Sequence, residues 1–371
     1  MECPQIPQVN CTQFGQRLYA QVHGKRIPVN GSIELTFRCN LRCVHCFCNV
    51  PPNDPTALEE EMKTEEVLRM IDQLAEEGCL WFLITGGEPL LRGDVLKVLL
   101  HAKKRGLITT LFTNGTLVTD RVADSLAEWP PHSVEITLYG VTQKTYEKIT
   151  GVSGSFRRCM RGIELLLERN VPLALKTMAM TLNQEEILQI KAFAEERGLK
   201  FRFDPLLNPR LDGSKGPCDF RLSPDEVLKM DLEDEHRSRE WREFCGKFIT
   251  PLSSEYLFDC GAGISTFHID PYGQMSACEM ARFRSYDLRC GSFGEGWNDA
   301  IPEILKLKPK ADYPCSQCEL ISLCGQCPGW AWLEKGSMEQ PVEYLCRIAH
   351  LRAAAFRERK PMSGEENGTN A

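Results

Sequence analysis

Between residues 33 and 203 the sequence alternates between short apolar runs and longer segments whose apolar residues recur at helical spacing. The apolar runs cover residues 33–37, 80–85, 108–112, 134–138, 173–180 and 200–203. The helical segments cover residues 64–78, 94–104, 120–128, 155–168 and 185–197, and another begins at Pro224 behind an N-cap at Ser223. Such alternation is typical of parallel strands joined by helical crossovers. Six units are fewer than the eight of a closed barrel, so we predict an α/β fold with a partial (βα)6 TIM-like barrel.

The sequence changes character outside this region. Residues 1–31 hold two short runs around a turn at 23–25 and predict an N-terminal hairpin. We expect the barrel over 32–207, a polar bridging region over 208–254 and a small cysteine-rich domain over 255–350. Residues 351–371 form a C-terminal tail, whose polar end we expect to be disordered.

The charge balance excludes several classes of partner. A net charge of -7, from 44 Lys and Arg against 51 Asp and Glu, predicts no nucleic-acid binding and no binding to an anionic membrane. The first 31 residues contain no apolar core of a signal peptide, and the longest purely apolar run, 79–84, is too short to span a bilayer. We therefore expect a cytoplasmic protein. Structural disulfides are disfavoured there, so clustering among the 18 cysteines indicates metal or redox chemistry.

Three cysteines, Cys39, Cys43 and Cys46, follow directly on the first strand-like run. Their thiolates lie on one loop and can converge on a single metal centre. Cys48 is available as a fourth ligand, which keeps a structural zinc site as an alternative. With three ligands only, the loop leaves one iron of a four-iron cluster open, and an open iron can bind and activate another molecule.

The second strand-like run ends in Gly86-Gly87-Glu88. The two glycines let a ligand approach the backbone closely, and Glu88 offers a carboxylate to an ammonium group. Because reactive groups gather at the carboxyl ends of parallel strands, we expect this segment beside the cysteine loop. Taken by itself, the segment also fits an ordinary tight turn.

The CX3CX2C spacing of Cys39, Cys43 and Cys46, with Gly86-Gly87-Glu88 at the next strand end, resembles the radical S-adenosylmethionine (SAM) superfamily. The resemblance implies a partial barrel and a [4Fe-4S] cluster whose open iron binds the amino and carboxylate groups of SAM. It implies that Gly86, Gly87 and Glu88 receive the methionine amino group. Nucleoside-side contacts from Asn114 and Thr137, and a weaker one from Lys176, are also implied.

Seven cysteines between 260 and 346 exceed one tetrahedral site and suit two. Their CX2C pairs, by spacing alone, equally fit a pair of zinc ribbons. Behind a radical SAM barrel they resemble a SPASM domain with two auxiliary [4Fe-4S] clusters. The resemblance assigns Cys260, Cys278 and Cys327 to the first cluster and Cys315, Cys318, Cys324 and Cys346 to the second. The first set lacks a fourth ligand, because Ser254 stands where some members carry cysteine; Cys245 and an open iron are the alternatives.

The combined resemblance covers most of the chain and implies a radical SAM oxidoreductase of the peptide-maturase type. It implies reductive cleavage of SAM to a 5′-deoxyadenosyl radical and oxidative cross-linking of a ribosomally made peptide. Alternatives are protein oxidation like that of anaerobic sulfatase maturases, tetrapyrrole or cofactor modification and, from a different class, a non-catalytic iron-sulfur or zinc scaffold.

The same resemblance implies several partners. These are a peptide or protein substrate and a low-potential electron donor such as a flavodoxin or ferredoxin. The 31 residues before the barrel are too few for a winged-helix leader-binding domain, so a separate leader-binding protein is expected. Tyr139 and Asp204, at strand ends, are candidate substrate contacts, and no catalytic acid or base is identified.

Overall fold

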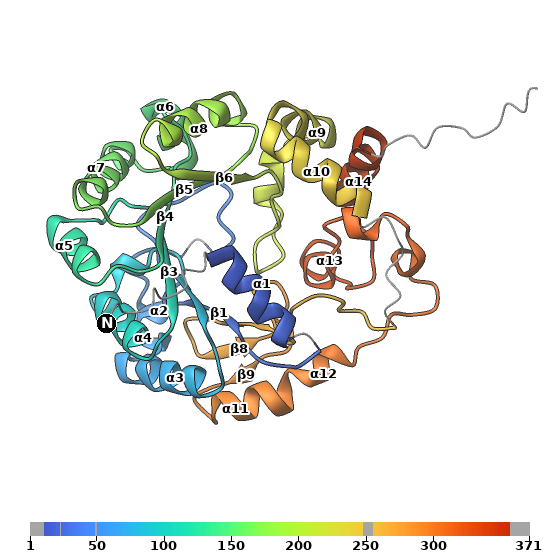
Figure 1. Cartoon of the computed structure of the whole chain (residues 1–371), viewed down its shortest axis with the longest axis horizontal. Helices are drawn as coiled ribbons and strands as arrows, with labels where there is room; N and C mark the ends of the chain where they lie inside the picture. The colour runs from blue at the N-terminus through green and yellow to red at the C-terminus, as the bar shows by residue number, and fades with distance from the viewer. Residues whose placement is uncertain (1–10, 23, 49, 248–254, 357–371) are drawn as a thin grey trace, which may run out of the picture.

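The structure is a computed structural model that describes residues 11–22, 24–48, 50–247 and 255–356. Its centre is a parallel sheet that curves around an inner space, with helices on the outside (Figure 1). The first six strands lie side by side in chain order, and each neighbouring pair among them is parallel. These strands are β1 (Asn30–Glu34), β2 (Trp81–Thr85), β3 (Ile108–Thr113), β4 (Ser133–Thr137), β5 (Leu173–Met178) and β6 (Lys200–Asp204). The predicted parallel α/β core is thus confirmed.

Helices cover the outer face because alternate residues of each strand are apolar and buried beneath them. Ile33, Ile84 and Leu111 are fully buried and belong to the same apolar core as Val67 and Ile71 of one covering helix. The covering helices are α3 (Thr64–Glu76), α4 (Val95–Lys104), α5 (Asp120–Glu128), α6 (Gln143–Thr150), α7 (Ser155–Glu168) and α8 (Ile187–Glu195). The opposite strand face, at the intervening positions, lines the inner space and carries polar groups such as Glu135 and Lys176.

The sheet continues into the cysteine-rich segment. Strand β7 (Thr266–Ile269) pairs in parallel with β1, and β8 (Gln274–Ser276) and β9 (Tyr286–Asp287) follow in antiparallel order. The sheet order is β6-β5-β4-β3-β2-β1-β7-β8-β9. The sequence analysis did not predict these three strands. Strands of two to four residues are too short to show an alternating pattern in the sequence.

The predicted N-terminal hairpin was also wrong where the structure describes it. Residues Cys11–Val22 form helix α1. Its less exposed positions, Gly15, Leu18 and Val22, recur at helical spacing, and the hairpin prediction treated this stretch as a strand. Residues 1–10 and 23 lie outside the described residues.

The bridging region is largely helical. Ser223 caps α9 (Pro224–Glu233) as predicted, and Glu226 completes a capping box. Further helices are α2 (Pro55–Glu60), α10 (Glu235–Lys247), α11 (Phe293–Glu295), α12 (Pro302–Leu305), α13 (Pro328–Lys335) and α14 (Glu343–Phe356). The predicted tail thus begins as helix up to Phe356, and residues 357–371 lie outside the described part.

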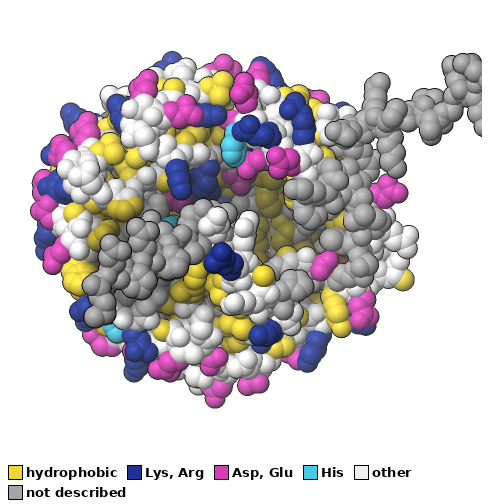
Figure 2. Space-filling model, viewed as in Figure 1, with side chains coloured by type: hydrophobic (Ala, Val, Ile, Leu, Met, Phe, Trp, Pro, Cys, Tyr) yellow, Lys and Arg dark blue, Asp and Glu magenta, His cyan; other side chains and the backbone are white. Residues whose placement is uncertain are grey.

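None of the helices among the described residues is long and apolar enough to cross a membrane. Figure 2 shows that the face seen in Figure 1 is hollowed near its middle, where hydrophobic side chains come into view. Acidic and basic side chains are scattered together around the rim of this face.

Candidate functional site

The cysteine loop, residues 39–46, lies just beyond the carboxyl end of β1 and is held by backbone hydrogen bonds along its length. The Cys39 amide donates to Val50 O at 2.9 Å, the Arg42 amide to Thr150 O at 2.9 Å and the Val44 amide to Ile149 O at 3.0 Å. Cys39 and Cys43 are buried and Cys46 is half-buried. The loop therefore presents its three thiols from a fixed backbone.

The three thiols lie close enough to influence each other's ionisation. Burial raises the pKa of Cys39 to about 12, and the charges of Glu88 and Cys46 act in the same direction. Burial raises the pKa of Cys43 well above its usual value, with further contributions from Cys46 and Cys39. Thiols held in this way ionise when a bound cation stabilises the thiolates, which fits soft thiolate ligands for iron.

A search of the described ranges, 11–22, 24–48, 50–247 and 255–356, finds no group of three His, Cys, Asp or Glu side chains arranged to hold a metal ion. Cluster ligation by Cys39, Cys43 and Cys46 therefore stays a prediction. Cys48, the possible fourth ligand of a zinc site, has its sulfur 3.9 Å from that of Cys46.

The segment 86–88 lies directly against the start of the cysteine loop, as expected. The Gly87 amide donates to Thr36 O at 2.6 Å and the Glu88 amide to Arg38 O at 2.9 Å. A Cβ on Gly86 would stand 2.4 Å from Thr36 O, and one on Gly87 would stand 2.4 Å from Arg38 O. Glycine is required at both positions because only hydrogen fits between the two backbones.

Glu88 is completely buried and already bonded within the protein. Its carboxylate accepts hydrogen bonds from the Thr113 hydroxyl at 2.7 Å, the Asn114 amide at 2.7 Å and the Leu90 amide at 3.0 Å. Burial raises its pKa to about 7, and these donors partly offset that rise. Glu88 thus joins the ends of β2 and β3, and its contact with the amino group of SAM remains a prediction.

Asn114 is locked against the cysteine loop. Its side-chain amide donates to Asn40 Oδ1 at 2.9 Å and lies 3.7 Å from Cys39 Sγ. Its Oδ1 accepts from the Thr116 hydroxyl at 2.6 Å. The side chain is therefore oriented from both sides beside the first cysteine.

Thr137 and Lys176 face each other at the ends of β4 and β5. The Lys176 ammonium lies over the ring of Phe112 and 4.0 Å from Glu135. Burial lowers the pKa of Lys176 well below its usual value. Both residues line the inner space, and their predicted contacts with SAM remain untested.

The two candidate substrate contacts differ in environment. Tyr139 is buried, bonds to Cys43 through its hydroxyl and packs edge-on against His45 with ring centroids 5.0 Å apart. Its position supports the cysteine loop. Asp204 accepts a 2.8 Å hydrogen bond from the Leu206 amide, and its surroundings raise its pKa through desolvation.

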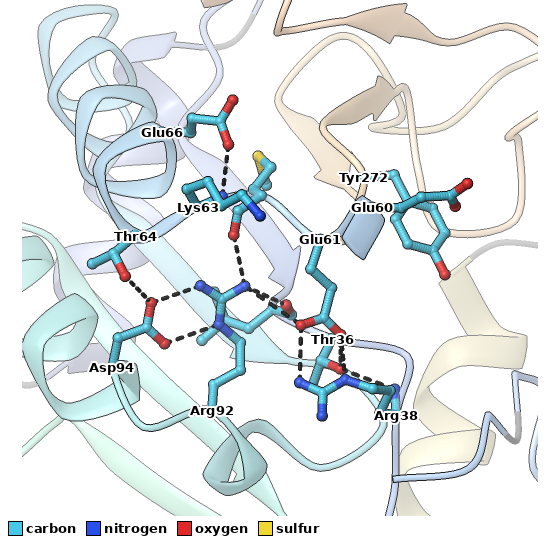
Figure 3. A network of polar contacts seen from close by, with 12 residues as sticks. Thr36, Arg38, Glu60, Glu61, Lys63, Thr64, Glu66, Arg92, Asp94 and Tyr272 are labelled. Atoms are coloured by element: carbon cyan, nitrogen blue, oxygen red, sulfur yellow. Dashed lines mark hydrogen bonds and ion pairs between the residues drawn. The ribbon is translucent and has the colours of Figure 1, made fainter. Parts of the chain in front are cut away.

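A buried polar network at the base of the cysteine loop was not foreseen from the sequence. We call it the Glu61 clamp, and Figure 3 shows its side chains pointing toward one another. Glu61 accepts from the Thr36 hydroxyl and from Arg38, at 2.8 Å through Nε and 2.9 Å through Nη2. Arg92 lies beside it, paired with Asp94 at 2.6 Å and donating to two backbone carbonyls. The clamp fixes the backbone that immediately precedes Cys39.

A second unforeseen network joins β1 to the cysteine-rich segment. His268 of β7 bonds to Ser32 Oγ at 2.8 Å and to Glu34 Oε2 at 3.0 Å. Arg282 pairs with the same Glu34 oxygen at 2.8 Å. Burial alone would raise the pKa of Glu34, but His268 and Arg282 hold it below its usual value. A lone His and Arg far apart in the sequence gave no signal of this network.

The SPASM resemblance divides the seven C-terminal cysteines into two groups, and this division stays a prediction. Burial raises the pKa of Cys260 and Cys278, and the Cys327 thiol raises both further. Burial likewise raises the pKa values in the second group, with Cys318 contributing to each of the three that shift: Cys315, Cys324 and Cys346. Ligation by either group remains a prediction.

Cys245 is buried. It packs with Leu323, Ala349 and Phe356 in a small core that Cys324 borders. The suggestion that Cys245 completes the first set stays a prediction. Ser254 lies outside the described residues.

Comparison with known proteins gives three informative matches. The family model described as "Radical SAM superfamily" matches residues 33–194. An AdoMet-dependent heme synthase of Methanosarcina barkeri is 26% identical over 337 residues, covering 84% of this chain and 94% of that protein. The mycofactocin maturase MftC of Mycobacterium ulcerans is 29% identical over 315 residues, covering 81% and 83%.

Among solved structures, Streptococcus suis SuiB bound to the precursor peptide SuiA aligns with a TM-score of 0.67 at 18% identity. The alignment covers 91% of this chain and 82% of that one. At this identity the likeness concerns the fold, and it extends through the barrel and the cysteine-rich segment together.

Proposed function

Because residues 33–194 form a radical SAM domain, we propose that this chain is an enzyme that reductively cleaves SAM and oxidatively cross-links a ribosomally made peptide. The observation that carries the proposal is that the segment 86–88 is hydrogen-bonded to Thr36 and Arg38, directly before the three-cysteine loop. An electron carrier or a structural zinc site does not require this segment beside its cysteine ligands.

Cys39, Cys43 and Cys46 would hold a [4Fe-4S] cluster and leave one iron for SAM. When bound, that cluster would supply the electron that breaks the carbon–sulfur bond of SAM. Gly86 and Gly87 let the segment 86–88 pack directly against the backbone of Thr36 and Arg38, while Asn114 orients the loop at Cys39. The Glu61 clamp fixes the backbone that precedes Cys39. A reactive intermediate reaches its target only if the groups around it are held in fixed positions.

Two further [4Fe-4S] clusters are proposed for the C-terminal groups. Cys260, Cys278 and Cys327 would hold the first, and Cys315, Cys318, Cys324 and Cys346 the second. The support is that the thiols of each group affect one another's ionisation. Such clusters accept the electron that an oxidative cross-link releases from the substrate.

The peptide substrate is supported by MftC, named a maturase, and by SuiB, which was solved with a precursor peptide. We also propose that the enzyme works in the cytoplasm with a low-potential flavodoxin or ferredoxin and a separate leader-binding protein. Reduced thiolates and clusters persist in that compartment.

Tetrapyrrole modification is the second candidate. The observation that favours it is the heme synthase match, which covers 94% of that relative. The two candidates share SAM cleavage and differ in the molecule that loses hydrogen.

The test uses the anaerobically reconstituted protein with dithionite and SAM, and measures 5′-deoxyadenosine by chromatography. We expect release by the wild type, none by Cys43→Ala, and unchanged release by the control Cys290→Ala, whose thiol is exposed outside the three sets. No release from an iron-replete wild type would refute the proposal. Mass spectrometry then distinguishes the substrates, because a cross-linked peptide or an iron porphyrin would lose hydrogen atoms while the other stays intact.

A further inference from the structure

A basic surface lies outside the cysteine loop. We call it the α7 arginine face, and it consists of Arg42 in the loop and Arg157, Arg158 and Arg161 on α7; all four are exposed. Between residues 142 and 169 the sequence holds six Lys and Arg against three Glu, in a chain whose net charge is -7. The face is thus a local positive region on an acidic protein.

Most of the charge on this face is not neutralised by neighbours. Within the described part of the chain, Arg157 and Arg158 form no ion pair, and Arg42 donates only to Gly151 O at 3.1 Å. Arg161 is paired with Glu168 at 3.5 Å and lies 3.9 Å from Glu164. The positive electrostatic field of exposed arginines without an ion pair can attract an approaching acidic partner.

A second basic stretch of the surface, around residues 306–310, has its charges neutralised by neighbouring glutamates. On the cysteine-rich side Lys306, Lys308 and Lys310 each face a glutamate, at 2.5, 2.7 and 3.2 Å. That stretch therefore offers little net positive field. The α7 arginine face differs from this stretch because Arg157 and Arg158 have no ion pair in the described residues, so its positive charge can attract an acidic surface.

The α7 arginine face is separated from Cys39 by one layer of side chains. Arg157, Arg158 and Thr116 line the same open hollow of about 490 Å³. The Thr116 hydroxyl donates to Asn114 at 2.6 Å and accepts from Asn40 at 2.8 Å. The Asn114 amide in turn lies 3.7 Å from Cys39 Sγ. An electron arriving at this hollow crosses a short, bonded path to the first thiol.

We propose that the α7 arginine face docks an acidic one-electron carrier protein that reduces the cluster held by the cysteine loop. The inference rests on the proposed function and adds the place where the electron enters. Transfer makes and breaks no bond: the carrier loses one electron and the cluster gains it. Charge complementarity sets the association rate and orientation of such short-lived complexes.

The test compares the reconstituted wild type with R157E/R158E and measures binding of a purified flavodoxin at low ionic strength. We expect the dissociation constant to rise at least about tenfold, since like charges would then oppose the acidic partner. Wild-type binding should weaken as salt is added. The cluster of the variant should be reduced more slowly by flavodoxin hydroquinone and at the wild-type rate by dithionite.

R239E/R242E is the matched control, with two exposed arginines reversed on α10, which lies across the molecule from α7 (Figure 1). The proposal is overturned if R157E/R158E binds flavodoxin like the wild type, or if the α10 variant shows the loss instead. The milder R157Q/R158Q should lose affinity in the same direction. Absence of SAM cleavage with dithionite in the wild type would defeat the proposed function, whereas a failure of docking alone leaves dithionite-driven cleavage intact.

Discussion

Replacing Glu61 by glutamine removes the negative charge at the centre of the Glu61 clamp. The carboxylate bonds to Arg38 at 2.8 and 2.9 Å, and both side chains are less than a tenth exposed. Glutamine keeps the size but turns a donor toward a guanidinium that then lies buried without its counter-charge. Breaking a buried pair in this way costs about 3–5 kcal/mol.

The expected loss is large enough to measure as a thermal midpoint. At roughly 2.1 cal/mol/K per residue, unfolding of a chain this long has an entropy near 0.8 kcal/mol/K, so the midpoint of E61Q should fall by about 4–6 °C. The assay is anaerobic thermal unfolding of the reconstituted protein. Because Arg38 precedes Cys39, we also expect E61Q to lose iron faster to a chelator.

E65Q is the control, because Glu65 lies 3.8 Å from Lys97 with both side chains mostly exposed. Exposed pairs contribute about 0–1 kcal/mol, so its midpoint should move by about 1 °C or less. The unfolding midpoint of R38M/E61M should lie closer to the wild-type value than that of E61Q. With two apolar side chains, neither position leaves a buried charge without its partner. The reasoning is refuted if E61Q matches E65Q, or if the double variant is the least stable of all.

Three further predictions concern the site. The pKa of Glu88 is about 7 in the folded protein against 4.5 in the unfolded chain, so folding takes up a proton between these values. The contribution of Glu88 to stability is therefore complete below pH 4.5 and is lost as the pH rises through 7, so the wild type should lose up to about 3 kcal/mol relative to E88Q across that window. A difference in unfolding midpoint that stays constant with pH would contradict this. G87A should abolish SAM binding in equilibrium dialysis because its Cβ meets the Arg38 carbonyl, whereas G93A, with open space around its Cβ, should bind normally. Removing Cys318 should lower bound iron by about four atoms while the SAM-dependent spectral change persists, and an unchanged iron content would argue against the second auxiliary cluster.

The sequence was sufficient for the parts of the fold that depend on local pattern. The strands from β2 to β6 could be predicted because each holds several apolar residues bounded by turns, and their parallel order then placed the segment 86–88 beside Cys39. Helix α1 was missed because its short amphipathic stretch also fits a strand. Strand β7 was missed because its partner lies more than 200 residues away.

The two polar networks could not be predicted for a related reason. Glu61 and Glu34 look like surface carboxylates in a chain that is 26% charged, and their burial depends on partners brought close only by folding. The pairing of Glu34 with His268 spans 234 residues. Sequence spacing can identify cysteines that share one loop. It cannot identify a buried ion pair, because the partners come together only when the whole chain has folded.

Because β7 pairs with β1, the cysteine loop and the cysteine-rich segment are attached to the same sheet. Strand β1, which leads into Cys39, pairs over residues 30–33 with β7, which precedes Cys278 in the chain. A fragment cut before residue 255 would expose an unprotected β1 edge and strand the Glu34 charge without its two cations. If the proposed clusters are present, the shared sheet would fix the separation between the SAM cluster and the first auxiliary cluster.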